Sequence, residues 1–182
     1  MTVIHTKRLL LRRIEAADAP DFARLCNDEL IARNTARIPH PYTLQDAEGF
    51  VAFIGGVFDS GAEYAFAVCE AGELVACCGV TGPEGNFDLG YWVGAPFRGR
   101  GVATEAARAV AHFAFEKLGA DILQAAHFTD NPASGRVLEK AGFRYTGESR
   151  KQFSLGRGHE ADSFRMTLAH ADFAPPEGVR VA

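Results

Sequence analysis

The sequence predicts a single α/β domain over residues 1–182, with its elements in the order β-α-α-β-β-β-α-β-α-β-β. Two observations support this fold class. The spacing of apolar residues alternates along the chain between the period of a strand and the period of a helix. In the middle of the chain, three strand-like segments are separated only by short turns, which indicates an antiparallel meander.

The first part of the chain predicts one strand and two helices. Residues 7–13 contain a short apolar run flanked by charge, which is typical of a strand. Asp18 is a suitable N-cap for a helix that buries Phe22. Thr43, followed by Asp46 three residues later, resembles a capping box and predicts a second helix.

The remaining elements begin with the meander. Its strands are predicted at 64–69, 74–81 and 87–93, because these segments are rich in β-branched and aromatic residues. A helix follows over 104–118, then a strand over 122–128, then a helix that Asn131 begins and Gly142 ends. Two last strands are predicted at 143–148 and 162–168, and residues 173–182 are expected to form a loose tail.

The composition argues against several classes of protein. Lysine and arginine total 19 against 23 acidic residues, so the chain lacks the basic excess of proteins that bind nucleic-acid backbones. No segment approaches the roughly 20 apolar residues of a membrane span, and the start lacks the apolar run of a signal peptide. We therefore expect a cytoplasmic protein with neither a nucleic-acid nor a membrane partner.

The cysteines and histidines do not predict a metal or redox site. The four cysteines show no CxxC spacing, and the six histidines form no HExxH motif. Cys77 and Cys78 lie inside an apolar strand segment and are expected to be reduced and buried. No metal is predicted.

A glycine-rich turn between a strand and a helix predicts an anion-binding loop. The strand ending at Val93 leads to the loop, whose sequence is Arg98-Gly99-Arg100-Gly101-Val102-Ala103-Thr104. The first turn of a helix leaves backbone N–H groups unpaired and carries the positive end of the helix dipole, which suits a pyrophosphate. The two glycines permit close approach of the backbone, and the two arginines add positive charge.

This loop resembles the pyrophosphate-binding motif Q/R-x-x-G-x-G/A of the GNAT superfamily of N-acetyltransferases, with Arg98, Gly101 and Ala103 in register. Segments 6–12, 90–93, 103–106, 131–134 and 137–143 are similar to the branch of ribosomal-protein N-terminal acetyltransferases. The resemblance implies a mixed, mostly antiparallel sheet of about seven strands flanked by about four helices. It also implies acetyl-CoA as a cosubstrate and a primary amine as the acceptor, in particular a protein or peptide N-terminal α-amine.

Other phosphate-binding motifs fit these glycines less well. A Walker-type sequence is absent. A dinucleotide-binding fingerprint would require glycine or alanine where this chain has Thr104.

The resemblance also implies roles for individual residues in binding acetyl-CoA. Backbone groups of Trp92 and Val93 would pair with the pantetheine arm, and residues 98–104 would bind the pyrophosphate. Asn131 would contact the cofactor as well as cap its helix.

The acid and the base of the reaction are less clearly marked. Many relatives place a tyrosine acid where this chain has Leu138, and Ser134 offers a hydroxyl instead, although an ordinary first-turn role for Ser134 stays open. Asp88 occupies a strand position where relatives carry a glutamate. It is a candidate general base or, equally, a solvated acid.

The acceptor is not marked by a motif. An α-amine, with a pKa of about 7.7 to 8.0, is roughly a tenth neutral at pH 7, whereas a lysine amine is neutral well below about one part in a thousand. This difference favours an α-amine.

Two alternatives stay open: a small-molecule amine or antibiotic acetyltransferase, and a non-catalytic acyl-CoA-binding module. We expect the acceptor to contact the helices within 18–59 and the loop 156–159. Separately, exposed strand edges are compatible with a homodimer.

Overall fold

The computed structural model describes residues 2–83 and 85–182. Within these residues one sheet contains the strands β1 (Ile4–His5), β2 (Leu9–Arg13), β3 (Glu63–Glu70), β4 (Glu73–Thr81), β5 (Asn86–Val93), β6 (Ile122–Phe128), β7 (Arg144–Ser154), β8 (His159–Ala169) and β9 (Arg180–Val181). The α-helices of the same residues are α1 (Ala19–Cys26), α2 (Glu29–Arg33), α3 (Leu44–Ser60), α4 (Val102–Leu118) and α5 (Pro132–Ala141).

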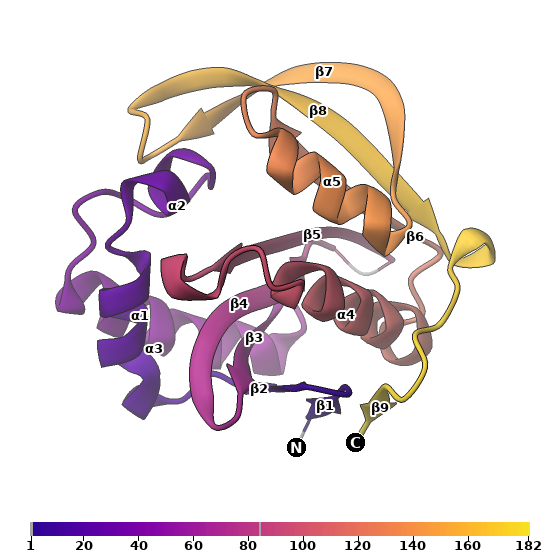
Figure 1. Cartoon of the computed structure of the whole chain (residues 1–182), viewed down its shortest axis with the longest axis horizontal. Helices are drawn as coiled ribbons and strands as arrows, with labels where there is room; N and C mark the ends of the chain where they lie inside the picture. Colours follow the sequence, from indigo (N-terminus) through magenta and orange to yellow (C-terminus); the bar gives the residue numbers. More distant parts are fainter. Residues whose placement is uncertain (1, 84) are drawn as a thin grey trace.

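The strands lie in the order β7-β8-β6-β5-β4-β3-β2-β1-β9 (Figure 1). Among the pairs within the described residues, only β5 and β6 are parallel, and the others are antiparallel. The mixed, mostly antiparallel α/β fold that the sequence predicts is therefore confirmed. The described residues form nine strands and five α-helices, where about seven and about four were predicted.

The additional elements are short and explain the difference in number. The helix α2 spans five residues, and the Asp28 carboxylate caps it by accepting from the Leu30 N–H at 2.8 Å. The strand β9 pairs with β1, and Val3 and Ala182 exchange two backbone hydrogen bonds of 3.0 and 2.9 Å. The end of the segment predicted as a loose tail is thus part of the sheet, because its pairing partner lies at the other end of the chain.

The predicted helix boundaries rest on caps that the structure contains. Thr43 and Asp46 form the predicted capping box at the start of α3. The Asn131 side chain accepts from the Ser134 N–H at the start of α5. Gly142, with φ of 107°, ends that helix in the left-handed conformation that suits glycine.

Helices cover the sheet and bury its aromatic side chains. In Figure 1, α4 runs in front of β4 and β5, whereas α3 lies behind, where it packs on β3 and contacts α1. The Phe66 ring of β3 lies 5.5 Å from Phe58 of α3 and 5.3 Å from Phe113 of α4. The Trp92 ring of β5 meets Phe22 of α1 edge-on at 5.3 Å. These contacts fix β5 between the two groups of helices.

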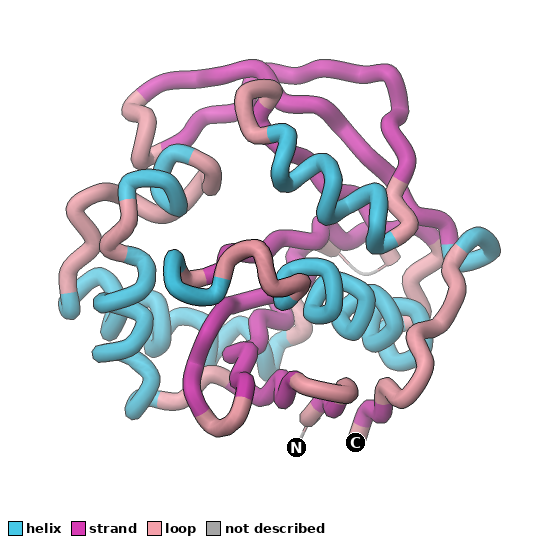
Figure 2. The backbone as a smooth tube through the Cα atoms, viewed as in Figure 1, coloured by secondary structure: helices cyan, strands magenta, loops and turns pink. Residues whose placement is uncertain are grey.

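The hairpin of β7 and β8 reaches across the molecule to α2 (Figure 2). The Leu155 N–H in its turn donates to the Ala36 carbonyl at 3.0 Å. A side chain at Gly156 would collide with the backbone of Ala32, because a Cβ there would lie 2.4 Å from its carbonyl carbon. The turn of this hairpin therefore packs closely against the end of α2 and against the residues that follow it.

The cysteines lie in the core. All four are buried and free, and Cys77 and Cys78 lie in β4 as predicted. Burial raises the pKa of the Cys77 thiol to about 12. Within residues 2–83 and 85–182, no group of His, Cys, Asp and Glu side chains is arranged to hold a metal ion, and no helix has the length and hydropathy needed to cross a bilayer.

Candidate active site

The site lies where β5 and β6 separate. The two strands run parallel but pair only over three residues, Asn86–Asp88 with Ile122–Gln124. From Leu89 to Val93, β5 has no strand partner on this side among the described residues. The chain after β5 leads into α4, and the chain after β6 leads into α5. Both helices therefore begin at the open end of this gap.

Backbone alternation decides which groups of β5 face the gap. The Gly94 N–H donates to the Val75 carbonyl on the β4 side at 2.9 Å. Because neighbouring residues of a strand turn their backbone groups to opposite edges, Trp92 also faces β4, whereas Val93 faces the gap. Arg98 Nε donates to the Val93 carbonyl at 3.2 Å. The Val93 N–H thus faces the gap, as the implied pairing with pantetheine requires. The backbone groups of Trp92 face β4, so Trp92 lines the cavity with its side chain.

The glycine-rich loop has the geometry that the sequence predicts. Gly99 and Gly101 have φ values of 75° and 80°, a conformation that is costly for other residues. Gly101 is the N-cap of α4, and the first helical hydrogen bond runs from the Glu105 N–H to the Gly101 carbonyl at 3.0 Å. The N–H groups of residues 102–104 thus precede the first intrahelical donor and point out of the helix start.

A cavity of about 330 Å³ lies against this loop. It is lined by Ser134 and by all the residues implied to bind the cofactor except Arg100, namely Trp92, Val93, Arg98, Gly99, Gly101, Val102, Ala103, Thr104 and Asn131. The structure thus brings together residues that are up to 42 positions apart in the sequence. Because unpaired N–H groups at a helix start suit phosphate oxygens, the cavity fits a pyrophosphate.

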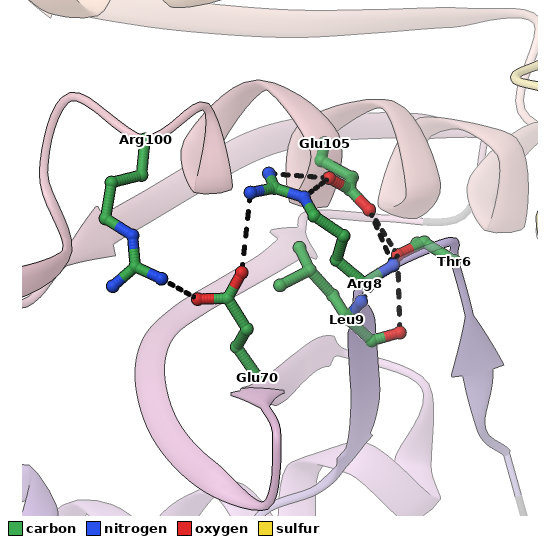
Figure 3. A network of polar contacts seen from close by, with 6 residues as sticks. All are labelled: Thr6, Arg8, Leu9, Glu70, Arg100 and Glu105. Carbon is green, nitrogen blue, oxygen red and sulfur yellow. Dashed lines mark hydrogen bonds and ion pairs between the residues drawn. The ribbon is translucent and has the colours of Figure 1, made fainter.

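The two arginines of the loop both have carboxylate partners. Arg98 forms an ion pair of 2.7 Å with Asp28, the cap of α2. Arg100 forms one of 2.7 Å with Glu70 (Figure 3). Much of the positive charge that the arginines were expected to add is therefore balanced, and the backbone supplies the unpaired donors of this loop.

The first turn of α4 is held by the N-terminal segment (Figure 3). The Glu105 carboxylate accepts from the Thr6 hydroxyl at 2.6 Å and from Arg8 Nε at 2.9 Å. Burial of Glu105 opposes its ionisation, but the hydrogen bonds from Thr6 and Arg8 outweigh burial and lower its pKa. The carboxylate therefore stays charged beside the helix N-terminus, where the dipole also favours a negative charge.

Ser134 faces Tyr91 across the gap. The Tyr91 hydroxyl oxygen lies 2.8 Å from Ser134 Oγ and 3.1 Å from the Ser134 carbonyl oxygen, so both are within hydrogen-bond reach. Asn131 fixes the same turn, because its side chain accepts from the Ser134 N–H at 3.3 Å. The hydroxyl of Ser134 is therefore held at a defined position in the first turn of α5.

A second cavity, of about 900 Å³, also has Ser134 in its wall, together with Asp88. The Asp88 carboxylate is half exposed and forms an ion pair of 2.9 Å with Arg165 of β8. The two cavities share the lining residues Asn34, Thr35, Tyr91, Trp92 and Ser134.

The region expected to contact the acceptor contributes only in part to the wall of the larger cavity. The wall of the larger cavity includes residues of the predicted range 18–59, among them Phe22, Tyr42 and Phe53. Of the turn between β7 and β8, the cavity wall contains Leu155 but none of residues 156–159. That turn is instead occupied by contacts with α2.

Three residues that line both cavities were not predicted from the sequence. Tyr91 lies in a segment quoted only for its resemblance to relatives. The strand alternation that places Leu89, Tyr91 and Val93 on one set of positions was the available signal. Asn34 and Thr35 follow a helix too short to show a clear period, so no sequence pattern pointed to them.

The separated strands, the loop suited to phosphates and the two adjoining cavities are arranged as in a site that brings two ligands to one point. Comparison with known proteins agrees. The model of the acetyltransferase (GNAT) domain matches residues 8–144. The uncharacterized N-acetyltransferase p20 of Bacillus licheniformis is 24% identical over 179 residues, which cover 96% of this chain and 99% of p20.

Solved structures with the same fold include RimL and RimJ. RimL, a ribosomal L7/L12 alpha-N-protein acetyltransferase in complex with coenzyme A, has a TM-score of 0.82 at 16% identity, covering 92% of this chain and 97% of RimL. Mycobacterium smegmatis RimJ has a TM-score of 0.81 at 20% identity, covering 94% of this chain and 88% of RimJ.

The family match settles the class of this enzyme. The domain model covers well over half of the chain, so the chain belongs to the GNAT family of acetyltransferases. It is an acetyl-CoA-dependent N-acetyltransferase.

Proposed function

We propose that this enzyme transfers the acetyl group of acetyl-CoA to the N-terminal α-amine of a protein or peptide. The observation that carries the proposal is the meeting of two cavities at Ser134, Tyr91 and Trp92. In this proposal the smaller cavity, beside the loop 98–104, receives the cofactor. The larger cavity receives the acceptor, so amine and thioester meet where the cavities join.

The cofactor side follows from the unpaired backbone donors. The N–H groups at the start of α4 would bind the pyrophosphate, and the Val93 N–H would bind the pantetheine arm or polarise the thioester carbonyl. Such polarisation helps because negative charge develops on the carbonyl oxygen as the amine attacks.

The transfer requires one proton to leave nitrogen and one to reach sulfur. The amine nitrogen attacks the thioester carbonyl carbon, and collapse of the tetrahedral intermediate breaks the C–S bond, leaving its electron pair on sulfur. Ser134 donates its proton to that sulfur. Asp88, in the wall of the acceptor cavity, takes the proton from nitrogen directly or through water. Asp88 then releases its proton to water, water returns a proton to Ser134, and the products are an amide and coenzyme A.

Two arguments support an α-amine as the acceptor: the fraction of it that is neutral at pH 7, and the activity for which a structural relative is named. An α-amine is roughly a tenth neutral at pH 7, so it needs less help from a base than a lysine does. RimL, similar in fold, is named as an alpha-N-protein acetyltransferase. An opening of about 900 Å³ accommodates the first residues of an extended peptide.

The test combines binding with an acceptor screen. Calorimetry should detect acetyl-CoA binding, and absence of binding at millimolar concentration would contradict the cofactor assignment. Release of free thiol should then depend on the acceptor when peptide N-termini are compared with polyamines and aminoglycosides. Turnover confined to small amines would replace the proposed acceptor, and binding without any acceptor-dependent release would indicate a non-catalytic acyl-CoA-binding module.

A further inference from the structure

Tyr91 spans the gap between the two halves of the site. It belongs to β5, and its hydroxyl contacts the first turn of α5, which follows β6. Its ring lines both cavities. Tyr91 is thus the side chain through which the strand that faces the cofactor contacts the helix that carries Ser134.

The tyrosine hydroxyl has one proton and two acceptors within reach on Ser134. In one arrangement Tyr91 donates to the Ser134 carbonyl oxygen at 3.1 Å, and the serine hydroxyl donates to Tyr91 across 2.8 Å. In the other arrangement Tyr91 donates to Ser134 Oγ. The serine proton then has no partner on Tyr91 and is free to point elsewhere.

Only the second arrangement leaves Ser134 able to act as an acid toward sulfur. A serine that accepts a hydrogen bond is also a better donor, because linked hydrogen bonds polarise one another. Burial raises the pKa of the Tyr91 hydroxyl and outweighs the opposing hydrogen bond with Ser134. Tyr91 therefore keeps its proton at neutral pH and remains a donor.

We infer that Tyr91 is a positioning residue for the acetyl transfer, whose hydroxyl donates to Ser134 Oγ and thereby directs the serine proton toward the sulfur of acetyl-CoA. The inference rests on the proposed function of Ser134 as the acid. As the C–S bond breaks, the electron pair on sulfur takes the Ser134 proton. The Tyr91 hydroxyl bond stabilises the charge that develops on Oγ until water returns a proton.

Tyr91→Phe removes the hydroxyl and keeps the ring. We expect kcat to fall about tenfold, the effect of losing one hydrogen bond in the transition state, while the Kd for acetyl-CoA changes less than about twofold. In a Ser134→Ala background the same substitution should leave kcat unchanged, because Tyr91 acts only through Ser134.

The matched control is Tyr64→Phe. Tyr64 lies in β3, packs edge-on against Phe58 and Phe113, and is absent from the walls of both cavities. Its substitution should leave kcat at the wild-type value. The inference is overturned if Tyr91→Phe turns over like the wild type, or if its effect is as large without Ser134 as with it. If the wild type itself fails to bind or transfer acetyl groups, the proposed function fails instead.

Discussion

Ser134 gains its proposed role from its surroundings. A serine in the first turn of a helix commonly bonds to nearby backbone. Here the Asn131 side chain accepts a hydrogen bond from the Ser134 N–H, and the Tyr91 hydroxyl contacts both the carbonyl and the hydroxyl oxygen of Ser134. The hydroxyl is therefore fixed at the junction of two cavities, where a sulfur leaving group would lie in the proposed reaction.

Substitution of Ser134 by alanine tests this role. We expect kcat to fall by roughly a hundredfold, the lower end of general acid catalysis, with the Kd for acetyl-CoA nearly unchanged. Single-turnover kinetics and calorimetry would measure the two quantities separately. Ser60→Ala, at the exposed end of α3, is the control. Unaltered turnover in Ser134→Ala would remove Ser134 from the mechanism.

The glycines of the loop allow a second test with a matched control. Gly101→Ala places a Cβ on a backbone with φ of 80°, which strains the start of α4 by about 1 kcal/mol. Gly72, with φ of 86°, lies in the turn between β3 and β4, and a Cβ there has nothing within 4 Å. Both alanine variants should lose similar stability.

The two variants should differ in cofactor binding. Only Gly101→Ala should weaken acetyl-CoA binding, by about tenfold, because the strain moves the N–H groups that face the pyrophosphate. Equal dissociation constants for Gly72→Ala and Gly101→Ala would mean that the loop does not bind the cofactor.

Several site residues could be predicted from the sequence, and others could not. Gly101 and Asn131 belong to local patterns of turn and cap, which a short stretch of chain determines. The ion pair of Arg98 with Asp28 joins residues 70 positions apart, so it depends on how α2 packs beside the loop. The contact of Tyr91 with Ser134 likewise depends on the distance between two diverging elements.

At the scale of elements, α2 and the β7–β8 turn are joined by one arginine. The Arg157 guanidinium pairs with both oxygens of Asp130 at 2.7 and 2.9 Å and donates to the Arg33 carbonyl at 2.6 Å. It also stacks over the Phe128 ring at 4.4 Å. The Arg157 side chain, only 8% exposed, therefore joins three segments: the β7–β8 turn, α2, and the end of β6 with the residues that follow it.

Loss of this arginine should destabilise the fold. Arg157→Ala is expected to cost about 2 kcal/mol, because charged hydrogen bonds are lost and the Arg33 carbonyl loses its partner. The melting temperature should fall by roughly 4 to 8 °C for a chain of this size. The exposed pair of Arg24 with Asp21 provides the control, and Arg24→Ala should change stability by less than about 0.5 kcal/mol. Similar melting temperatures for the two variants would contradict this role.

Elements with strong local signals were predicted well, and weak ones were missed. α3 and α5 carry caps, and the meander carries three apolar strands with clear turns, so both followed from the sequence. α2, β1 and β9 are two to five residues long and show no period. Their existence depends on tertiary contacts, such as the pairing of β1 with β9.

Across the whole molecule, several carboxylates are stabilised in their charged form. Asp18 is buried, which opposes ionisation, but hydrogen bonds from Arg12 and the Glu15 N–H outweigh burial and lower its pKa below its ordinary value of 3.8. The pKa values of Glu105 and Asp130 are also lowered. Below about pH 4, the unfolded chain therefore binds more protons than the folded chain does.

Acid should consequently unfold the protein. The stability contributed by these carboxylates is present above their unfolded pKa values, near 4, and is lost as the pH falls through the lower folded values. Urea unfolding should show little change in the stability contributed by these groups between pH 7 and 5 and a steep loss toward pH 3. Asp18→Asn should be less stable at pH 7 and should lose less stability on acidification. An equally steep loss in that variant would contradict the assignment to Asp18.

The pairing of β5 with β6 is short, so a small change in the angle between the two halves of the sheet would be magnified at the site. Five residues of β5 extend beyond the three paired ones, an arm of roughly 17 Å at about 3.3 Å per residue. A rotation of only about 3° at the paired segment would shift the end of that arm by about 1 Å, a displacement that can cost an enzyme about a hundredfold in rate. The buried Phe87 and Leu123 lie in the paired segment, so substitutions there are expected to alter reactivity at the far end of β5.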